Sequence, residues 1–225
     1  MRDMPKRLDI LASLANARHS CRAFLPDPVP EQVIHDLIAL AGRAPSWCNC
    51  QPWTLHLLSP GQTDELRPLL REAATTHAPD IRFPETYAGA YRDRRREAAR
   101  QLYEAVGVEW GNREQGDRQA LRNFDLFDAP QLLVLSTPKT LLPYSLVDCG
   151  IFLGGFLLAA EAAGVATIAQ GAIAGCAPLL HAHLDIPDDM SIVCGISLGY
   201  ARKDAPANAF RTGRADPRQI LHRPT

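Results

Sequence analysis

Three polar side chains alternate along a short segment near the N-terminus: Arg18, Ser20 and Arg22. Three prolines follow before residue 31, which predicts a largely extended backbone for residues 17–30. Alternate side chains of an extended chain point to the same face, so two guanidinium groups and a hydroxyl would lie together. Such a set suits a phosphate or a carboxylate. The alternative is a solvated surface strand, which the triplet alone does not exclude.

A second pair of cations lies near the other end of the chain. Arg211 and Arg214 flank a Thr-Gly turn. A phosphate monoester carries up to two negative charges and therefore needs more than one cation. If folding brings this pair beside Arg18, the two segments form one anion site. Otherwise residues 211–214 are an ordinary basic tail.

Residues 44–53 read Ala-Pro-Ser-Trp-Cys-Asn-Cys-Gln-Pro-Trp, which is typical of a structured loop. The prolines restrict the backbone path, while Ser46, Asn49 and Gln51 supply directed hydrogen-bonding groups. A loop of this kind on a rigid scaffold favours a planar polar ligand. Cys48 and Cys50 are too close for an easy disulfide, and no second Cys or His pair completes a zinc site.

Other glycine and histidine motifs give weaker signals. Gly171 follows Gln170 at the end of a short predicted strand, either to let backbone N–H groups approach a ligand or simply to turn into a helix. The Gly-x-x-x-Gly-Gly run at 150–155 has the wrong spacing and context for a dinucleotide fingerprint. His181-x-His183 lacks acids at ligand spacing, so we expect no metal site.

Composition limits the class of protein. The chain has 225 residues, 46% of them apolar, and a formal net charge of −1, which gives no support for a nucleic-acid or acidic-membrane partner. The six cysteines show no disulfide-scaffold spacing, and residues 1–20 carry charges without an apolar run, so we expect a reducing cytoplasm and no signal peptide. The apolar run at 149–160 is too short to span a bilayer. It predicts a helix buried on most faces, in a core or a subunit interface.

The helices and strands that must position these residues are predicted from hydrophobic periodicity and from the glycines and prolines that end regular structure. Helices are expected at 5–16, from 30, from 63, twice within 78–126 with a break near 107–116, at 146–163 and at 177–183. Strands are expected at 53–58, 131–136, 165–169 and 191–200. Segment 78–126 mixes arginines with aromatics, and its acids favour a solvated helix over a nucleic-acid surface. Without repeats or linkers, the chain is one α+β domain over 1–225, with an irregular tail from 202 that lies along a surface.

In this order the motifs resemble the FMN-dependent nitroreductases. The resemblance is carried by segments 18–24, 26–30, 44–53, 164–171, 184–188, 193–200 and 204–214. These segments span nearly the whole chain, and their combination is specific although each part is not. The middle segment, with Arg94-Arg-Arg96 and Leu121-Arg-Asn-Phe124, looks most like the nitrobenzoate-reductase branch.

The resemblance implies a central mixed or antiparallel sheet flanked by helices. It also implies an intertwined homodimer with one FMN in each of two interfacial sites, and a tail over about 202–225 that extends along the partner. Carried over by position, Arg18, Ser20 and Arg22 would bind the phosphate and ribityl chain. His19 would contribute at the flavin edge.

Further residues come from the matching later motifs. Arg211 and Arg214 would complete the phosphate site. Pro45, Ser46 and Asn49 would line the isoalloxazine ring from the other subunit.

The strand-to-helix motif supplies the last pair, since Gln170 and Gly171 would present backbone donors near flavin N5 and O4. The chain departs from the family pattern at Trp47 and Cys48, where smaller or polar residues are common. It departs again at Ala169, where a proline is frequent. These departures leave the flavin site in place and bear on the choice of substrate.

The implied function is an oxidoreductase. NADH or NADPH would reduce the FMN, and a nitroaromatic, quinone or similar electron-poor acceptor would then reoxidise it in the same cavity by ping-pong kinetics. No protein side chain is named as catalytic, because solvent can supply the protons. Two alternatives stay open: a flavoprotein of the same fold that cleaves flavin or dehydrogenates a biosynthetic intermediate, and a binding protein with a vestigial pocket. The choice between NADH and NADPH stays open too.

Overall fold

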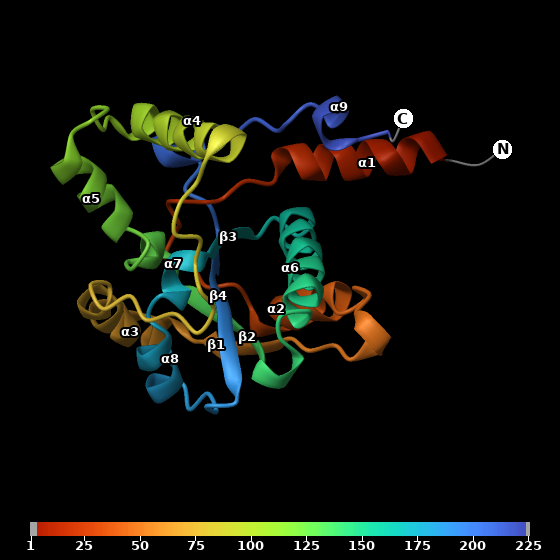
Figure 1. Cartoon of the computed structure of the whole chain (residues 1–225), viewed down its shortest axis with the longest axis vertical. Coiled ribbons are helices and arrows are strands. Elements are labelled where there is room, and N and C mark those ends of the chain that lie inside the picture. The colour runs from red at the N-terminus through yellow and green to blue at the C-terminus, as the bar shows by residue number, and fades with distance from the viewer. Residues whose placement is uncertain (1–3, 224–225) are drawn as a thin grey trace.

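A four-stranded antiparallel sheet forms the centre of the computed structural model, which describes residues 4–223 of the predicted domain (Figure 1). The strands are β1 (Thr54–Leu58), β2 (Gln131–Pro138), β3 (Ala166–Gln170) and β4 (Met190–Gly199), in the spatial order β1-β2-β4-β3. Every neighbouring pair is antiparallel. This arrangement confirms the α+β prediction with a central antiparallel sheet.

Helices surround this sheet. They are α1 (Met4–Ala17), α2 (Glu31–Ala41), α3 (Pro60–Ala73), α4 (Gly89–Val106), α5 (Arg113–Leu121), α6 (Ser145–Ala162), α7 (Gly171–Ala174), α8 (Ala177–His183) and α9 (Pro217–Ile220). Short 3-10 turns lie between them, including Trp47–Asn49 and Leu126–Asp128.

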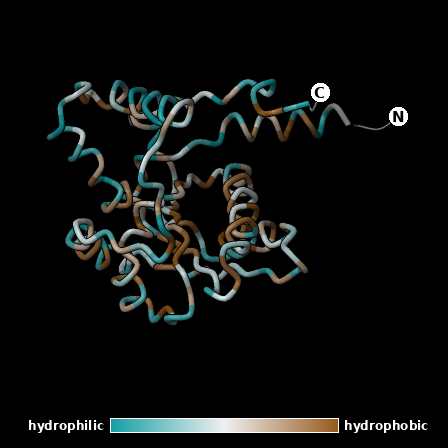
Figure 2. Tube along the Cα trace, viewed as in Figure 1, coloured by the Kyte–Doolittle hydropathy of each residue, from teal (hydrophilic) through white to brown (hydrophobic). Residues whose placement is uncertain are grey.

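Two hydrophobic cores lie on the two faces of the sheet. Along β2, Leu132 and Val134 pack in the core beneath α3 and α8, whereas Leu133 and Leu135 pack in the core beneath α2 and α6. This alternation follows from the two-residue period of a strand. Figure 2 shows hydrophobic segments gathered along the sheet and α6, with the most hydrophilic ones on α4 and α5. Because both faces of β2 are buried, its sequence is a continuous apolar run.

Two predicted helix boundaries were wrong, and capping explains both. α3 begins at Pro60 rather than Thr63, because Ser59 and Gln62 form a reciprocal capping box. The break between α4 and α5 ends at Asn112, whose side chain accepts a hydrogen bond from the N–H of Gln115. Gly116 therefore lies inside α5, where a Cβ would meet the hydroxyl of Tyr103 at 3.0 Å.

The sequence predicted that α6 is buried on most faces, but within a single chain much of this helix is exposed. Phe152 and Phe156 pack in the core, but only 39% of Ser145–Ala162 is buried, and Val147 and Ile151 are exposed. Within the described part of the chain it is the one helix apolar and long enough to cross a bilayer. Its packing against α2 and the sheet is that of a core helix with one uncovered side. Burial of that side in a subunit interface stays a prediction.

The two ends of the chain meet beyond one edge of the sheet, where α1, α4 and α9 lie together (Figure 1). After α1, the N–H of Cys21 donates to the carbonyl of Thr167 at 3.0 Å and ties the chain to β3. The N–H of Arg202 donates to Ala23 at 3.0 Å. The tail from 202 thus begins by packing on its own chain, and its extension along a partner stays a prediction.

Candidate functional site

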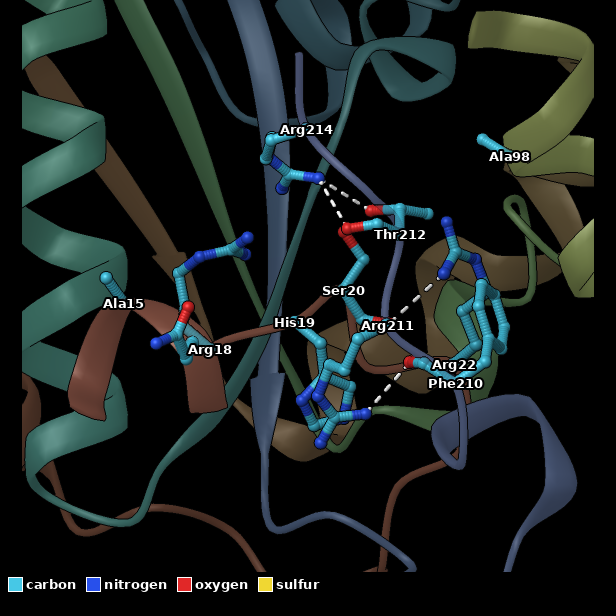
Figure 3. Close-up of a pocket in the computed structure, with 11 residues that line it drawn as sticks. Ala15, Arg18, His19, Ser20, Arg22, Ala98, Phe210, Arg211, Thr212 and Arg214 are labelled. Atoms are coloured by element: carbon cyan, nitrogen blue, oxygen red, sulfur yellow. Dashed lines mark hydrogen bonds between the residues drawn. The ribbon is translucent and has the colours of Figure 1, made fainter. Parts of the chain in front are cut away.

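A cavity of about 380 Å³ lies where the segment after α1 meets the C-terminal tail (Figure 3). Its lining residues are Ala15, Asn16, Arg18, His19, Ser20, Arg22, Ala98, Phe210, Arg211, Thr212 and Arg214. The two basic segments that lie nearly two hundred residues apart in the sequence therefore share one cavity. The anion-site interpretation requires this proximity, and the binding of an anion there stays a prediction. We call this space the arginine cavity.

The segment after α1 presents more residues to the cavity than strict alternation allows. The N–H of Arg18 still donates to Leu14 in the last turn of α1, at 2.9 Å. Cys21 turns inward and is fully buried, which directs Ser20 and Arg22 outward. His19 also lines the cavity, because the chain leaves the helix there before it becomes extended.

The arginine cavity is strongly positive. Of the described residues that line it, four are arginines and none carries a carboxylate. The guanidinium groups donate instead to neutral oxygens, as from Arg22 to the carbonyl of Ser20 at 3.2 Å and from Arg211 to that of Asn208 at 2.8 Å. Figure 3 shows Arg214 bonded to Thr212, with Arg18 and Arg22 on opposite sides of Ser20. Four cations without a counter-charge favour a ligand with more than one negative charge.

Burial perturbs two of these groups. Desolvation lowers the pKa of Arg22, and the neighbouring Cys21 opposes this shift to a smaller extent. Desolvation also lowers the pKa of His19, and the positive charges of Arg211 and Arg18 lower it further. The hydrogen bond to the carbonyl of Ala17 raises this pKa and opposes them only in part. The neutral ring lies with Nδ1 at 3.1 Å from that carbonyl, so Nδ1 donates. Its Nε2 is then a buried acceptor without a partner, available to a ligand hydroxyl.

Residues 45–51 lie away from the arginine cavity of the same chain. Pro45 and Asn49 are exposed, and Ser46 is half-buried, with its hydroxyl accepting the N–H of Gln51 at 3.0 Å. Cys48, Asn49 and Gln51 all have positive φ, between 48° and 57°, a conformation that is costly for residues other than glycine and is typical of functional loops. Contribution of this loop to a partner's site stays a prediction.

A buried carboxylate holds this loop against the start of α6. The backbone N–H of Trp47 donates to Oδ1 of Asp148 at 3.0 Å, and the Cys50 thiol donates to Oδ2 at 3.6 Å. The Trp47 ring packs edge-on against Tyr144 at 5.1 Å between centroids. Asp148 is 4% exposed. It is a positioning residue that no motif indicated.

Gln170 and Gly171 do not line the arginine cavity. The Gln170 side chain is buried, with its amide donating to the carbonyl of Asn123 at 2.8 Å and accepting from the hydroxyl of Ser197. That side chain is therefore committed to the fold. Gly171 is exposed and begins α7. Their backbone role toward a flavin stays a prediction.

Several residues of the arginine cavity and its support were not named from the sequence as site residues, three of them close to Arg211 in the tail. Phe210 and Thr212 line the cavity on either side of Arg211. Asn208, 6% exposed, accepts the N–H of Arg22 at 2.7 Å and so holds the two segments together. Their sequence signals are adjacency to the arginine pair and a place in the 204–214 segment that carries the family resemblance. Within residues 4–223, no group of three or more His, Cys, Asp or Glu is placed to bind a metal.

The fold and the cavity define an α+β protein with a cavity of four arginines where the segment after α1 meets the C-terminal tail. Residues 15–200 match the model of the Nitroreductase family, and the chain belongs to that family. It is 32% identical to a 4-nitrobenzoate reductase from Pseudomonas putida over 95% of each chain. It is 30% identical to nitroreductase NfnB from Mycolicibacterium smegmatis, over 90% of this chain and 87% of that protein.

Solved structures agree with this assignment. The crystal structure of the FMN-dependent nitroreductase NfnB from Mycobacterium smegmatis in complex with NADPH superposes with a TM-score of 0.90. That match covers 97% of this chain and 100% of the other at 28% identity. A protein that shares this fold over its whole length is thus FMN-dependent and binds NADPH.

The Asp148 contact yields a test of how the loop is held. Partial desolvation raises the pKa of the Cys50 thiol, and its hydrogen bond to the Asp148 carboxylate raises it further. Asp148→Asn keeps an oxygen for the Trp47 N–H but removes the charge, so the pKa of Cys50 should fall. Alkylation of Cys50 by iodoacetamide should then be faster near pH 8 and converge with wild type at high pH.

Mass spectrometry after timed alkylation measures this rate, with Cys48 in the same peptide as an internal reference. Asp188→Asn, a carboxylate outside the loop, is the matched control. An unchanged pH profile for Cys50 in Asp148→Asn would contradict the contact.

Proposed function

We propose that this chain is an FMN-dependent oxidoreductase that uses NADPH or NADH to reduce nitroaromatics, quinones or similar electron-poor acceptors. The observation that carries the proposal is the arginine cavity, with four guanidinium groups and no acid among its described lining residues. The named relatives, which are nitrobenzoate reductases and other nitroreductases, support the same reaction class. Their substrates point to a small aromatic acceptor.

The residues present fit the phosphate end of FMN. Arg18, Arg22, Arg211 and Arg214 would bind the dianionic phosphate through charge-assisted hydrogen bonds. The unpaired Nε2 of His19 would accept a hydroxyl of the ribityl chain. That acceptor is otherwise a buried polar atom without a partner, so a ligand hydroxyl there removes a desolvation cost.

The ring end of the cofactor requires residues from elsewhere. Pro45, Ser46 and Asn49 of a second subunit would line it, and Gln170 and Gly171 would supply backbone N–H groups. The exposed position of the 45–51 loop, outside its own chain's arginine cavity, supports a role in a partner's site.

Bound FMN supplies reversible two-electron chemistry, and the protein supplies orientation and electrostatics. The arginines add a positive field that stabilises negative charge developing nearby. His19 is neutral near pH 7 because its pKa is lowered, so it can act as a hydrogen-bond acceptor but is not a stored acid. Protons for the acceptor then come from solvent, and no side chain is assigned a catalytic role.

The proposed assembly is a homodimer. Large apolar side chains are exposed on α1 at Leu8, Ile10 and Leu11, and on α6 at Val147 and Ile151. Exposed apolar surface of this extent on adjacent helices is typical of an interface. The proposed compartment is the cytoplasm, because all six cysteines are free thiols.

Anaerobic mixing tests the reaction directly. Protein loaded with FMN should be yellow, and NADPH or NADH should bleach its absorbance near 450 nm within the turnover time. A nitroaromatic or quinone added afterwards should restore the colour. A yellow protein that neither nucleotide bleaches would instead support a flavoprotein with another reaction. A colourless protein that takes up no FMN would overturn the proposal.

Arg18→Ala tests the phosphate site. The Arg18 guanidinium makes no hydrogen bond or ion pair within the described chain, so its loss leaves the fold intact. Loss of one charge-assisted contact should weaken FMN binding by about 1.5–3 kcal/mol, or roughly ten- to a hundredfold in Kd. Flavin fluorescence titration measures the affinity. Arg118→Ala, which removes an exposed arginine of α5, is the control, and equal affinity in all three proteins would refute the role of Arg18.

Ile151→Asp tests the homodimer. Ile151 is 42% exposed on α6, and a carboxylate placed there would be buried without a partner in an interface. The variant should be monomeric in size-exclusion chromatography with light scattering, and should also lose FMN. Leu121→Asp, at a residue of 41% exposure on α5, should stay dimeric. A dimeric Ile151→Asp, or a monomeric wild type, would contradict the proposed interface.

A further inference from the structure

A second and larger groove continues from the arginine cavity. It has a volume of about 1000 Å³ and lies between α4 and the tail residues 212–220. Three residues, Ala98, Thr212 and Arg214, line both spaces. We call it the tail groove. A ligand in the tail groove would therefore lie directly beside the proposed FMN phosphate site.

The acids of the tail groove are already neutralised. Asp93 pairs with Arg92 at 3.1 Å, and Glu97 pairs with Arg100 at 2.9 Å. Asp216 likewise pairs with Arg218. None of these three partner arginines lines the groove. The carboxylates that line the groove thus form ion pairs with arginines that lie outside the groove.

The arginines that do line the groove are not neutralised. Arg94, Arg95 and Arg214 have no carboxylate partner within the described residues. Arg95 instead lies over the ring of Tyr87, with 5.3 Å between Cζ and the ring centroid. This contact orients the guanidinium and leaves its N–H groups available. The tail groove therefore presents uncompensated positive charge over an area well beyond the arginine cavity.

A second observation indicates a ligand with hydroxyl or amino groups. Gln101 lines the groove, and its amide nitrogen donates to Glu97 at 2.9 Å. Its Oε1 is buried and has no hydrogen-bond partner. An unpaired buried acceptor on a residue that lines a positive groove fits a ligand that carries both a donor and an anion.

We propose that the tail groove binds the phosphorylated adenosine end of NADPH, and that Arg94 and Arg95 select NADPH over NADH by contacting the 2′-phosphate. This proposal rests on the proposed oxidoreductase function. In doubly wound dinucleotide-binding domains, NADH sites place a carboxylate on the ribose 2′-hydroxyl, whereas NADPH sites place arginine near the 2′-phosphate, and the same charge logic applies to any site that binds the 2′-phosphate. Here the carboxylates are engaged and the arginines are not. Gln101 Oε1 would accept a ribose hydroxyl or the adenine amino group.

The size of the tail groove favours the dinucleotide over the acceptor. A groove of about 1000 Å³ exceeds what a single substituted benzene ring would fill. A carboxylated aromatic acceptor shares the anionic chemistry, however, so the experiment includes a separate arm for it.

Steady-state kinetics with FMN-loaded protein and a neutral quinone acceptor test the selection. Wild type should have a higher kcat/KM for NADPH than for NADH. Arg94→Ala and Arg95→Ala should each lower kcat/KM for NADPH at least about tenfold, as expected for loss of a charge-assisted contact, and change the value for NADH less than about twofold. Arg96→Ala is the matched control, since Arg96 lies on the same helix over Trp110 and outside the groove.

A binding measurement supplies a readout besides activity. Adenosine 2′-monophosphate should bind wild type and Arg96→Ala in isothermal titration, and bind Arg94→Ala at least about tenfold more weakly. Adenosine, which lacks the phosphate, should not distinguish the proteins. This arm also works if FMN turnover fails, so that failure of the proposed function and failure of the groove assignment can be separated.

Three results would overturn the proposal. The first is a ratio of kcat/KM for NADPH to kcat/KM for NADH that is unchanged in both variants. The second is a ratio near one in wild type. The third is a rise in KM for 4-nitrobenzoate in Arg94→Ala, without a rise for 4-nitrobenzyl alcohol or NADPH, which would reassign the groove to a carboxylated acceptor.

Discussion

The junction between the two ends of the chain depends on one buried side chain, Asn208. Its Oδ1 accepts the N–H of Arg22, and its Nδ2 donates to the carbonyls of Ala23 and Arg202 at 2.9 and 3.0 Å. Two of these three bonds join segments that are 186 and 185 residues apart, and the third, to Arg202, lies within the tail. Together with the backbone bond from Arg202 to Ala23, this Asn208 clamp places Arg211 beside the segment that follows α1. A smaller polar residue at 208 would satisfy fewer of these backbone groups and loosen both walls together.

This clamp also has to hold charges of one sign together. Arg18, Arg22, Arg211 and Arg214 repel one another, and the half-buried Arg22 is also desolvated, which lowers its pKa. Elsewhere the chain pairs its charges, as Arg71 and Arg122 do with Asp125. The contrast shows that the fold can supply counter-ions and omits them at this junction. A protein that leaves neighbouring cations uncompensated in this way gains stability when an anion binds.

Periodicity and turn chemistry were enough to predict the strands and most helices, because β2, β4 and α2 have strong apolar patterns with clear ends. The start of α3 was missed because a Ser-x-x-Gln capping box was outweighed by the acidic run from Asp64. From the residues alone, the grouping of Arg18 with Arg211 could be predicted only as an alternative, since no local pattern specifies a contact between distant segments. The family resemblance was needed to imply it. The role of Asp148 could not be predicted at all. It depends on a turn of α6 facing a loop nearly a hundred residues earlier.

The tail groove shows why residue type alone is a poor guide to charge. From sequence, segment 92–100 contains arginines and acids in near balance and is typical of a solvated helix. In the structure, Asp93 and Glu97 lie on the wall of the tail groove, but they pair with Arg92 and Arg100, which lie outside it. Arg94 and Arg95 lie on the same wall without a carboxylate partner among the described residues. The helix thus presents arginines that no acid pairs beside acids that are already paired. Recognition of an anion by α4 therefore depends on which neighbours pair, and not on the net charge of the chain.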